Sequence, residues 1–146
     1  MIKKLKFESI ADLFSDKINS GNPRMSSVSR CDYVIIKDKE ILFIEETNLM
    51  LKDLLNPRVY TREIVENVKK MWGSITIFMY YISAKGLIDE VKGKDRIYIL
   101  LLWKFDGKTV RALSNMIKTL IKYRNGGYAD VKYVTREDVD IRKGAN

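Results

Sequence analysis

The segment 31–47, CDYVIIKDKEILFIEET, most constrains how this chain can fold. It contains two short apolar runs, rich in β-branched residues, on either side of the polar break at 37–40. Runs of this kind, separated by so short a break, predict an antiparallel β-hairpin. We expect strands at 32–37 and 40–46, joined by a two-residue turn at Asp38 and Lys39.

With that turn, Val34 faces Phe43 and Asp32 faces Glu45. Opposed residues of an antiparallel pair share a face and hold their Cβ atoms about 5 Å apart, so the two carboxylates would repel each other. A divalent cation between them would remove the repulsion. Thr47 follows Glu45 by two residues and points to the same face, because side chains alternate along a strand.

Two alternatives remain open at this point. Asp-Lys is a weaker turn signal than Asn-Gly, and a slip of one residue would bring Glu46 to the acidic face in place of Glu45. Acids at strand ends also keep sheet edges solvated without binding any ligand.

Size and composition narrow the class of protein. The chain has 146 residues, 46% of them hydrophobic, which suits a single domain over 1–146 with a charged tail at 136–146. No stretch has the roughly 20 apolar residues of a membrane helix, so we expect a soluble protein with no membrane partner. The single cysteine, Cys31, flanks an apolar run, so we expect it to pack in the core. One cysteine cannot form a disulfide within the chain, which indicates a reducing, cytoplasmic setting. With no histidine, mechanisms that need an imidazole are excluded.

The net charge of +8 comes from 27 lysines and arginines against 19 acids. An anionic partner, above all a nucleic acid, is consistent with that charge. A basic protein that binds no nucleic acid has the same composition, so this alternative also stays open.

Apolar spacing predicts the remaining elements. The segment from 58 to 82 contains Gly73 and a β-branched stretch at 75–77, which favour a strand in its second half. Its apolar positions nevertheless stay in helical phase throughout, and this favours one long helix. Two elements are expected before the hairpin, a helix at 6–19 and an optional short strand at 24–30. After the hairpin we expect a helix from 58 to 82, a strand at 96–104 buried on both faces, a helix at 108–123 and a strand at 129–135. This order predicts an α/β fold with a central mixed sheet flanked by helices.

The arrangement resembles the PD-(D/E)XK nuclease-like superfamily, in particular the small archaeal Holliday junction resolvases and restriction-type endonucleases. Asp32 matches the first acid of the motif, and Glu45, within ILFIEET, matches the acid of the acid-x-lysine strand. The resemblance implies a restriction-endonuclease-like core in the order α-β-β-β-α-β, a DNA endonuclease activity that depends on Mg²⁺ or Mn²⁺, and a homodimer. It also implies that Glu8, on the first helix, is a further metal contact, although an acid near a helix N-terminus needs no ligand to explain it.

Two positions depart from the family pattern. Cys31 stands where the family has proline, and Thr47 occupies the lysine position. A threonine hydroxyl binds water but carries no positive charge. Either a lysine from a neighbouring element supplies the cation, with Lys69, Lys70 and Lys52 as candidates, or the domain binds nucleic acid without cutting it.

Basic residues supply candidate contacts to nucleic-acid phosphates. Arg111, Lys118 and Lys122 share one side of the predicted helix at 108–123, and Arg124 follows it. Lys3, Lys4 and Lys6 form a basic N-terminal arm. Nothing resembles a base-reading recognition helix, so we expect recognition of the backbone or of nucleic-acid structure. Three hypotheses follow: a metal-dependent endonuclease, an inactive nuclease-fold protein that binds nucleic acid, and a basic protein-interaction module.

Overall fold

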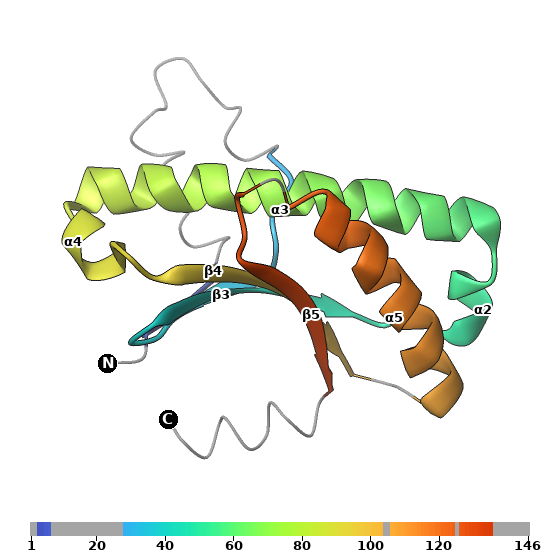
Figure 1. The fold of residues 1–146 in the computed structure, drawn as a ribbon. Coiled ribbons are helices and arrows are strands. Elements are labelled where there is room, and N and C mark those ends of the chain that lie inside the picture. The colour runs from blue at the N-terminus through green and yellow to red at the C-terminus, as the bar shows by residue number, and fades with distance from the viewer. Residues whose placement is uncertain (1–2, 7–27, 104–105, 125, 136–146) are drawn as a thin grey trace.

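A computed structural model of the chain describes residues 3–6, 28–103, 106–124 and 126–135 (Figure 1). Its elements are, in chain order, β1 (Lys3–Lys6), β2 (Tyr33–Ile36), β3 (Glu40–Thr47), α2 (Leu51–Leu54), α3 (Pro57–Lys85), α4 (Ile88–Val91), β4 (Asp95–Leu102), α5 (Gly107–Lys122) and β5 (Asp130–Thr135).

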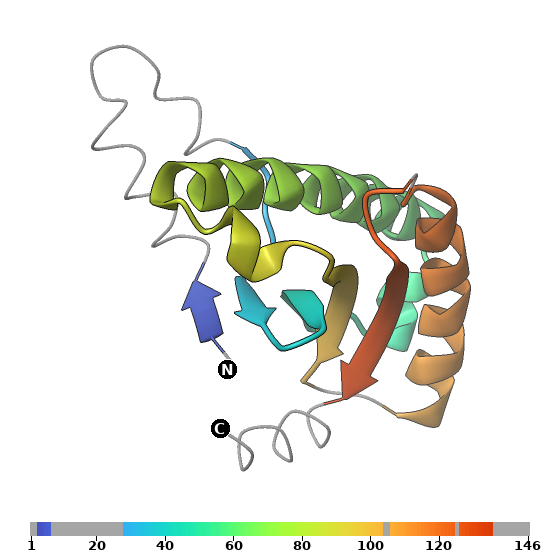
Figure 2. The same cartoon turned by 60° about the vertical axis from the view of Figure 1, so that its left-hand side comes forward.

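The described strands form one mixed sheet in the order β1-β2-β3-β4-β5. β1, β2 and β3 are an antiparallel meander, whereas β4 and β5 run parallel to β3. Parallel neighbours need crossover connections, and α3 and α5 supply them. The long α3 lies across the sheet and α5 packs beside it against β5 (Figures 1 and 2). The predicted α/β class and mixed sheet are confirmed.

Local sequence signals explain where α3 begins and ends. The Asn56 side chain accepts hydrogen bonds from the backbone N–H groups of Arg58 and Val59, and Pro57 occupies the first helical position. Gly86 ends the helix in the left-handed conformation, with φ of 66°. The helix is continuous through Gly73, so the prediction of one long helix is confirmed. None of the described helices has the length and apolar character needed to cross a membrane.

The sheet is apolar on both faces. The face toward α3 and α5 carries one buried cluster, which includes Phe43, Tyr98 and Leu100. The opposite face carries a second cluster, which includes Ile44 and Ile99. β4 contributes to both clusters, as its continuous apolar run predicts for a strand buried on both faces.

The N-terminal predictions need correction. The basic arm around Lys4 is the edge strand β1, because Lys3–Lys6 pair with Tyr33–Ile36 of β2. The described part of the optional strand at 24–30 is not a strand, and most of the predicted helix at 6–19 lies outside the described residues, as does the tail at 136–146. The short helices α2 and α4 carry no strong periodic signal and were not expected.

Candidate functional site

The hairpin has the register that the sequence predicts. Val34 pairs with Phe43 and Ile36 pairs with Ile41. The Lys37 N–H donates to the Glu40 carbonyl over 2.8 Å, which closes the two-residue turn. Glu45 therefore points to the face covered by α3, and the alternative in which Glu46 replaces it is wrong.

Asp32 departs from the regular ladder. β2 begins only at Tyr33, and the Asp32 N–H donates to the Ile44 carbonyl over 2.9 Å. The Asp32 carboxylate accepts a hydrogen bond of 2.7 Å from the backbone N–H of Glu46. The predicted direct cross-strand pairing of Asp32 with Glu45 is thus replaced by a bend, which still turns the aspartate toward the end of β3.

Lys70 of α3 completes a group of three side chains. Its ammonium is hydrogen-bonded to Glu45 Oε2, and the Glu45 side chain is only 10% exposed. Asp32, Glu45 and Lys70, here called the acid cluster, come from three separate segments of the chain. The Lys70 bond was not predictable from spacing, although Lys70 was one of the three candidate replacement lysines.

The electrostatics of the acid cluster follow from one cation facing two carboxylates. Burial raises the pKa of Glu45 to about 7, and the charge of Asp32 adds to the rise, while Lys70 opposes it. Burial on its own would lower the pKa of Lys70, but Glu45, Asp32 and Glu63 outweigh burial and raise it. Lys70 therefore stays protonated at neutral pH, and the cluster carries more negative than positive charge once Glu45 ionises.

A close crossing of two segments places Asp32. The chain at 28–31 passes α3 at Gly73, where a Cβ atom would lie 1.8 Å from the Ser29 carbonyl oxygen. The next residue, Ser74, is fully buried and its Oγ accepts a 2.8 Å hydrogen bond from the Cys31 N–H. These contacts fix the strand entry just before Asp32, so Gly73 marks a crossing point and not the end of a helix.

Buried polar contacts hold the rest of the neighbourhood. The Tyr98 hydroxyl donates to Asn67 Oδ1 over 2.9 Å. This bond links β4 to α3 three residues before Lys70. Burial raises the pKa of the Cys31 thiol well above its usual range, so this cysteine stays a packed thiol. The sequence signal for the crossing of segment 28–31 with α3 was Gly73-Ser74, two small residues that stand among bulky ones in the middle of the helix.

The other predicted site residues do not join the acid cluster. The Thr47 hydroxyl accepts from the Leu49 N–H over 3.3 Å, and Lys69 faces Glu66 with its side chain 59% exposed. Lys52 is exposed on α2. Glu46, on the opposite sheet face, accepts a 2.7 Å hydrogen bond from the Trp103 indole. Glu8 lies outside the described residues.

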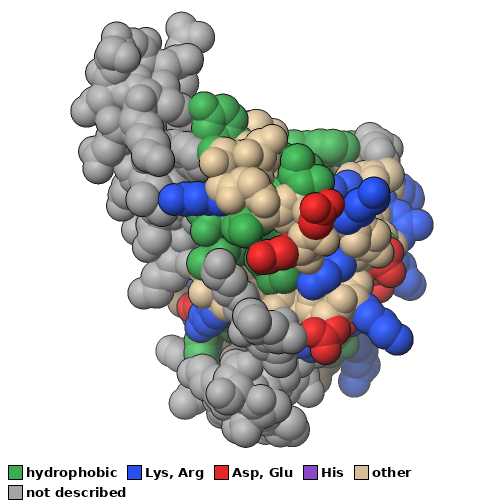
Figure 3. All heavy atoms as spheres, turned by 90° about the vertical axis from the view of Figure 1, so that its left-hand side faces the viewer, with side chains coloured by type: hydrophobic (Ala, Val, Ile, Leu, Met, Phe, Trp, Pro, Cys, Tyr) green, Lys and Arg blue, Asp and Glu red, His purple; other side chains and the backbone are tan. Residues whose placement is uncertain are grey.

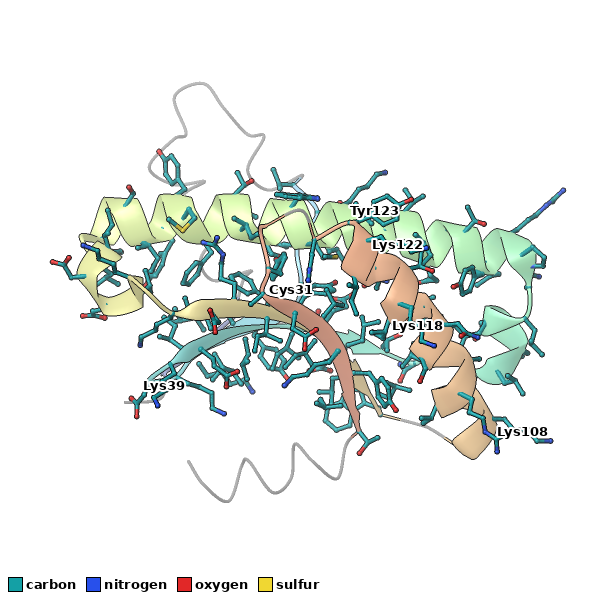
Figure 4. All side chains as sticks on the ribbon, in the orientation of Figure 1. Cys31, Lys39, Lys108, Lys118, Lys122 and Tyr123 are labelled. Carbon is teal, nitrogen blue, oxygen red and sulfur yellow. The ribbon has the colours of Figure 1, made fainter. Side chains whose placement is uncertain are left out.

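The predicted phosphate contacts fall into two places. Arg111, Lys118 and Lys122 are exposed on one side of α5. Lys108 is also exposed, and Figure 4 shows it in a row with Lys118 and Lys122 along the helix. We call these four residues the α5 stripe. Arg124 does not continue the stripe, because its Nη1 donates to the Ala129 carbonyl over 2.8 Å beyond the helix end. The sheet order separates the stripe, beside β5, from the acid cluster, at the β2–β3 end.

Comparisons with known proteins give no match. No protein-family model, curated protein or solved structure matches the chain. Within the described residues, no group of three or more carboxylate, cysteine or histidine side chains is arranged to hold a metal ion. Of the predicted metal ligands, the described residues bring together two, Asp32 and Glu45, and no third.

Proposed function

We propose that this chain is a metal-dependent phosphodiester hydrolase of nucleic acid, a DNA endonuclease with a restriction-endonuclease-like core. The observation that carries the proposal is the convergence of Asp32, Glu45 and Lys70 from three segments. From β2 onward, the strands, α3 and β4 follow one another in the order that the family resemblance implies, whereas β1 precedes the segment predicted as the first helix.

The carboxylates suit a hard divalent cation. Both donors are oxygens, which Mg²⁺ and Mn²⁺ prefer. Burial raises the pKa of Glu45 to about 7, with the charge of Asp32 adding to the rise, which means that the ionised pair needs more positive charge than Lys70 supplies. Asp32 and Glu45 would hold such an ion, which when bound acidifies a coordinated water and offsets charge on the phosphate.

Lys70 supplies the positive charge that Thr47, in the lysine position of the family pattern, cannot supply. Its ammonium is held at the carboxylates and, with a raised pKa caused by Glu45, Asp32 and Glu63 against the effect of burial, stays charged. Because a lysine with a raised pKa is protonated at neutral pH, Lys70 acts in the metal-free site as a hydrogen-bond donor and not as a general base. Its role in cleavage is therefore to attract a phosphate oxygen and to orient water by donating hydrogen bonds.

The decisive experiment compares cleavage by the wild type with cleavage by Asp32→Asn and Glu45→Gln. Asparagine keeps an oxygen that accepts the Glu46 N–H, and glutamine keeps the size of Glu45, so both variants retain the local packing. We expect nicking of supercoiled DNA or of a branched duplex with Mg²⁺ or Mn²⁺, none with chelator, and a loss of at least about a hundredfold in each variant. DNA binding in chelator should persist.

An inactive DNA-binding protein is the second candidate. It is favoured by the internal pairing of the acid cluster, in which Glu45 already contacts Lys70 and Asp32 already accepts a backbone N–H. Salt-sensitive DNA binding with no cleavage under any metal, unchanged in Asp32→Asn, would establish this function. Absence of DNA binding at moderate salt would rule out both candidates in favour of a protein-interaction module.

A further inference from the structure

A second, basic hollow lies at the opposite end of the strands. It has a volume of about 390 Å³ and lies between the start of β4 and the loop before β5, where its lining includes Lys94, Arg96 and Arg124. Arg96 pairs with Ile41, four residues before Glu45 on β3, so the acid cluster is roughly 13 Å away along the strand. The hollow is thus a separate site.

Its cationic side chains are held in place by backbone carbonyls. Arg96 Nε donates to Gly127 over 2.8 Å, Arg124 Nη1 to Ala129 over 2.8 Å and Lys94 Nζ to Lys37 over 2.6 Å. An arginine has five N–H donors, so each guanidinium keeps donors beyond its carbonyl bond.

Carboxylates balance these cations only in part. The charge of Asp38, in the turn between β2 and β3, acts on Lys94. Asp95 is the one carboxylate in the lining of the hollow, against three positive side chains. Neither of the ion pairs found within the described residues involves Lys94, Arg96 or Arg124. Three cations fixed around one hollow repel each other, and a multivalent oxyanion is the ligand that relieves the repulsion.

An apolar hollow adjoins the basic one. It has a volume of about 290 Å³, shares Lys94 and Arg96 with its neighbour, and is lined on the other side by Ile41, Phe78, Met79, Ile88 and Val91. On the end of the molecule that carries α4, lysine and arginine side chains lie among exposed hydrophobic ones, with some carboxylates between them (Figure 3). Together the hollows have the size of small-molecule sites, roughly 300–1,000 Å³.

We propose that the two hollows bind one phosphorylated small molecule with a flat aromatic ring, of the nucleoside monophosphate class. The phosphate lies against Arg96 and Arg124, where planar guanidinium groups match its oxygens. The ring lies over the apolar lining beside Ile88. This site is independent of the proposed nuclease function.

Calorimetric titration of the full chain with adenosine 5′-monophosphate, adenosine and inorganic phosphate tests the proposal. We expect the monophosphate to bind at least about tenfold more tightly than either fragment, because only it contacts both hollows. Arg124→Gln should weaken the monophosphate and phosphate by about tenfold, whereas Arg58→Gln, which changes net charge equally at the exposed start of α3, should not.

A second variant protects the test against misfolding. Ile88 is 51% exposed, so Ile88→Ser leaves the core intact, and it should weaken the monophosphate but not inorganic phosphate. Leu55→Ser, at another exposed apolar residue, is its control. No binding of the monophosphate at millimolar concentration, equal affinity for monophosphate and phosphate, or equal loss in Arg124→Gln and Arg58→Gln would overturn the proposal. Unchanged titrations in Asp32→Asn separate this site from the acid cluster.

Discussion

The acid cluster and the α5 stripe are both charged regions, but they differ in how their charges depend on one another. Lys70 and Glu45 share a hydrogen bond under α3, and the charges of Asp32 and Glu63 act on them. The residues of the stripe are exposed on one helix, and each extends into solvent separately.

The difference predicts two kinds of mutational response. In a partly buried cluster, removing one member leaves its partner uncompensated, so effects are large and not additive. In an exposed row, each cation contributes a small, salt-screened amount, so effects are modest and nearly additive. Under the proposed function, the chemistry therefore belongs to the acid cluster, and the stripe contributes to affinity.

The largest effect is expected at Lys70. Lys70→Gln should lower metal-dependent DNA cleavage by about a hundredfold or more, because it removes the cation that faces both carboxylates. Lys69→Gln removes the same charge from the neighbouring residue, which faces Glu66 in solvent, and should change the rate by less than about threefold. Initial rates at saturating DNA measure both variants. Equal rates in the two would place the required cation elsewhere.

A pH dependence of stability should mark the acid cluster. Burial, with the charge of Asp32, raises the pKa of Glu45 from 4.5 to about 7, so the folded chain holds this proton longer than the unfolded chain. The free energy of unfolding should therefore fall as pH rises from about 4.5 to about 7, by up to about 3 kcal/mol, and no further above that. Lys70 titrates above this window, because Glu45 and its neighbours raise its pKa against the effect of burial.

Urea unfolding at pH 5 and pH 7.5 measures this dependence. In Glu45→Gln the difference between the two pH values should shrink, whereas Glu66→Gln, at the partner of Lys69, should leave it unchanged. A wild type that becomes more stable across this interval, with no change of slope in Glu45→Gln, would contradict the uncompensated charge at the acid cluster.

The crossing at Gly73 should carry the next largest effect. Alanine is the better helix former by about 1 kcal/mol, but its Cβ would meet the Ser29 carbonyl, so Gly73→Ala should destabilise by about 1–3 kcal/mol net. Cleavage should fall with it, because the same segment positions Asp32. Ser83→Ala, at an exposed position of the same helix, should stay within about 0.5 kcal/mol in urea unfolding. A Gly73→Ala variant that is more stable than the wild type would show that the segment at 28–31 can move away from the added Cβ atom at little energetic cost.

Local patterns were enough to predict much of this fold. The turn at Asp38 and Lys39 set the hairpin register, and the helical phase of the apolar positions outweighed the β-branched stretch at 75–77 of α3. β1 was missed because its alternation is hidden among lysines, and an edge strand needs burial on only one side.

The acid cluster was predictable only in part. Alternation along β3 placed Glu45 on the covered face, but the bend at Asp32 arises from a long-range crossing with α3 that no local pattern encodes. The choice among lysines also depended on tertiary structure. Lys69 and Lys70 are adjacent in sequence, and only the rotation of α3 over the sheet decides which one faces Glu45.

The smallest effects are expected at the α5 stripe. Replacing Lys118 or Lys122 with glutamine should weaken DNA binding slightly, and should reduce the slope of log affinity against log salt by about 0.9 for each phosphate that the variant no longer neutralises. Cleavage at saturating DNA should not change, because neither residue contacts the acid cluster. Lys85→Gln, at the far end of α3, controls for net charge, and titrations at several salt concentrations give the slopes. If the losses of affinity add in the variant that carries both replacements, the charges of the stripe act independently. A stripe variant that abolishes cleavage without weakening DNA binding would contradict the separation of the stripe from the acid cluster.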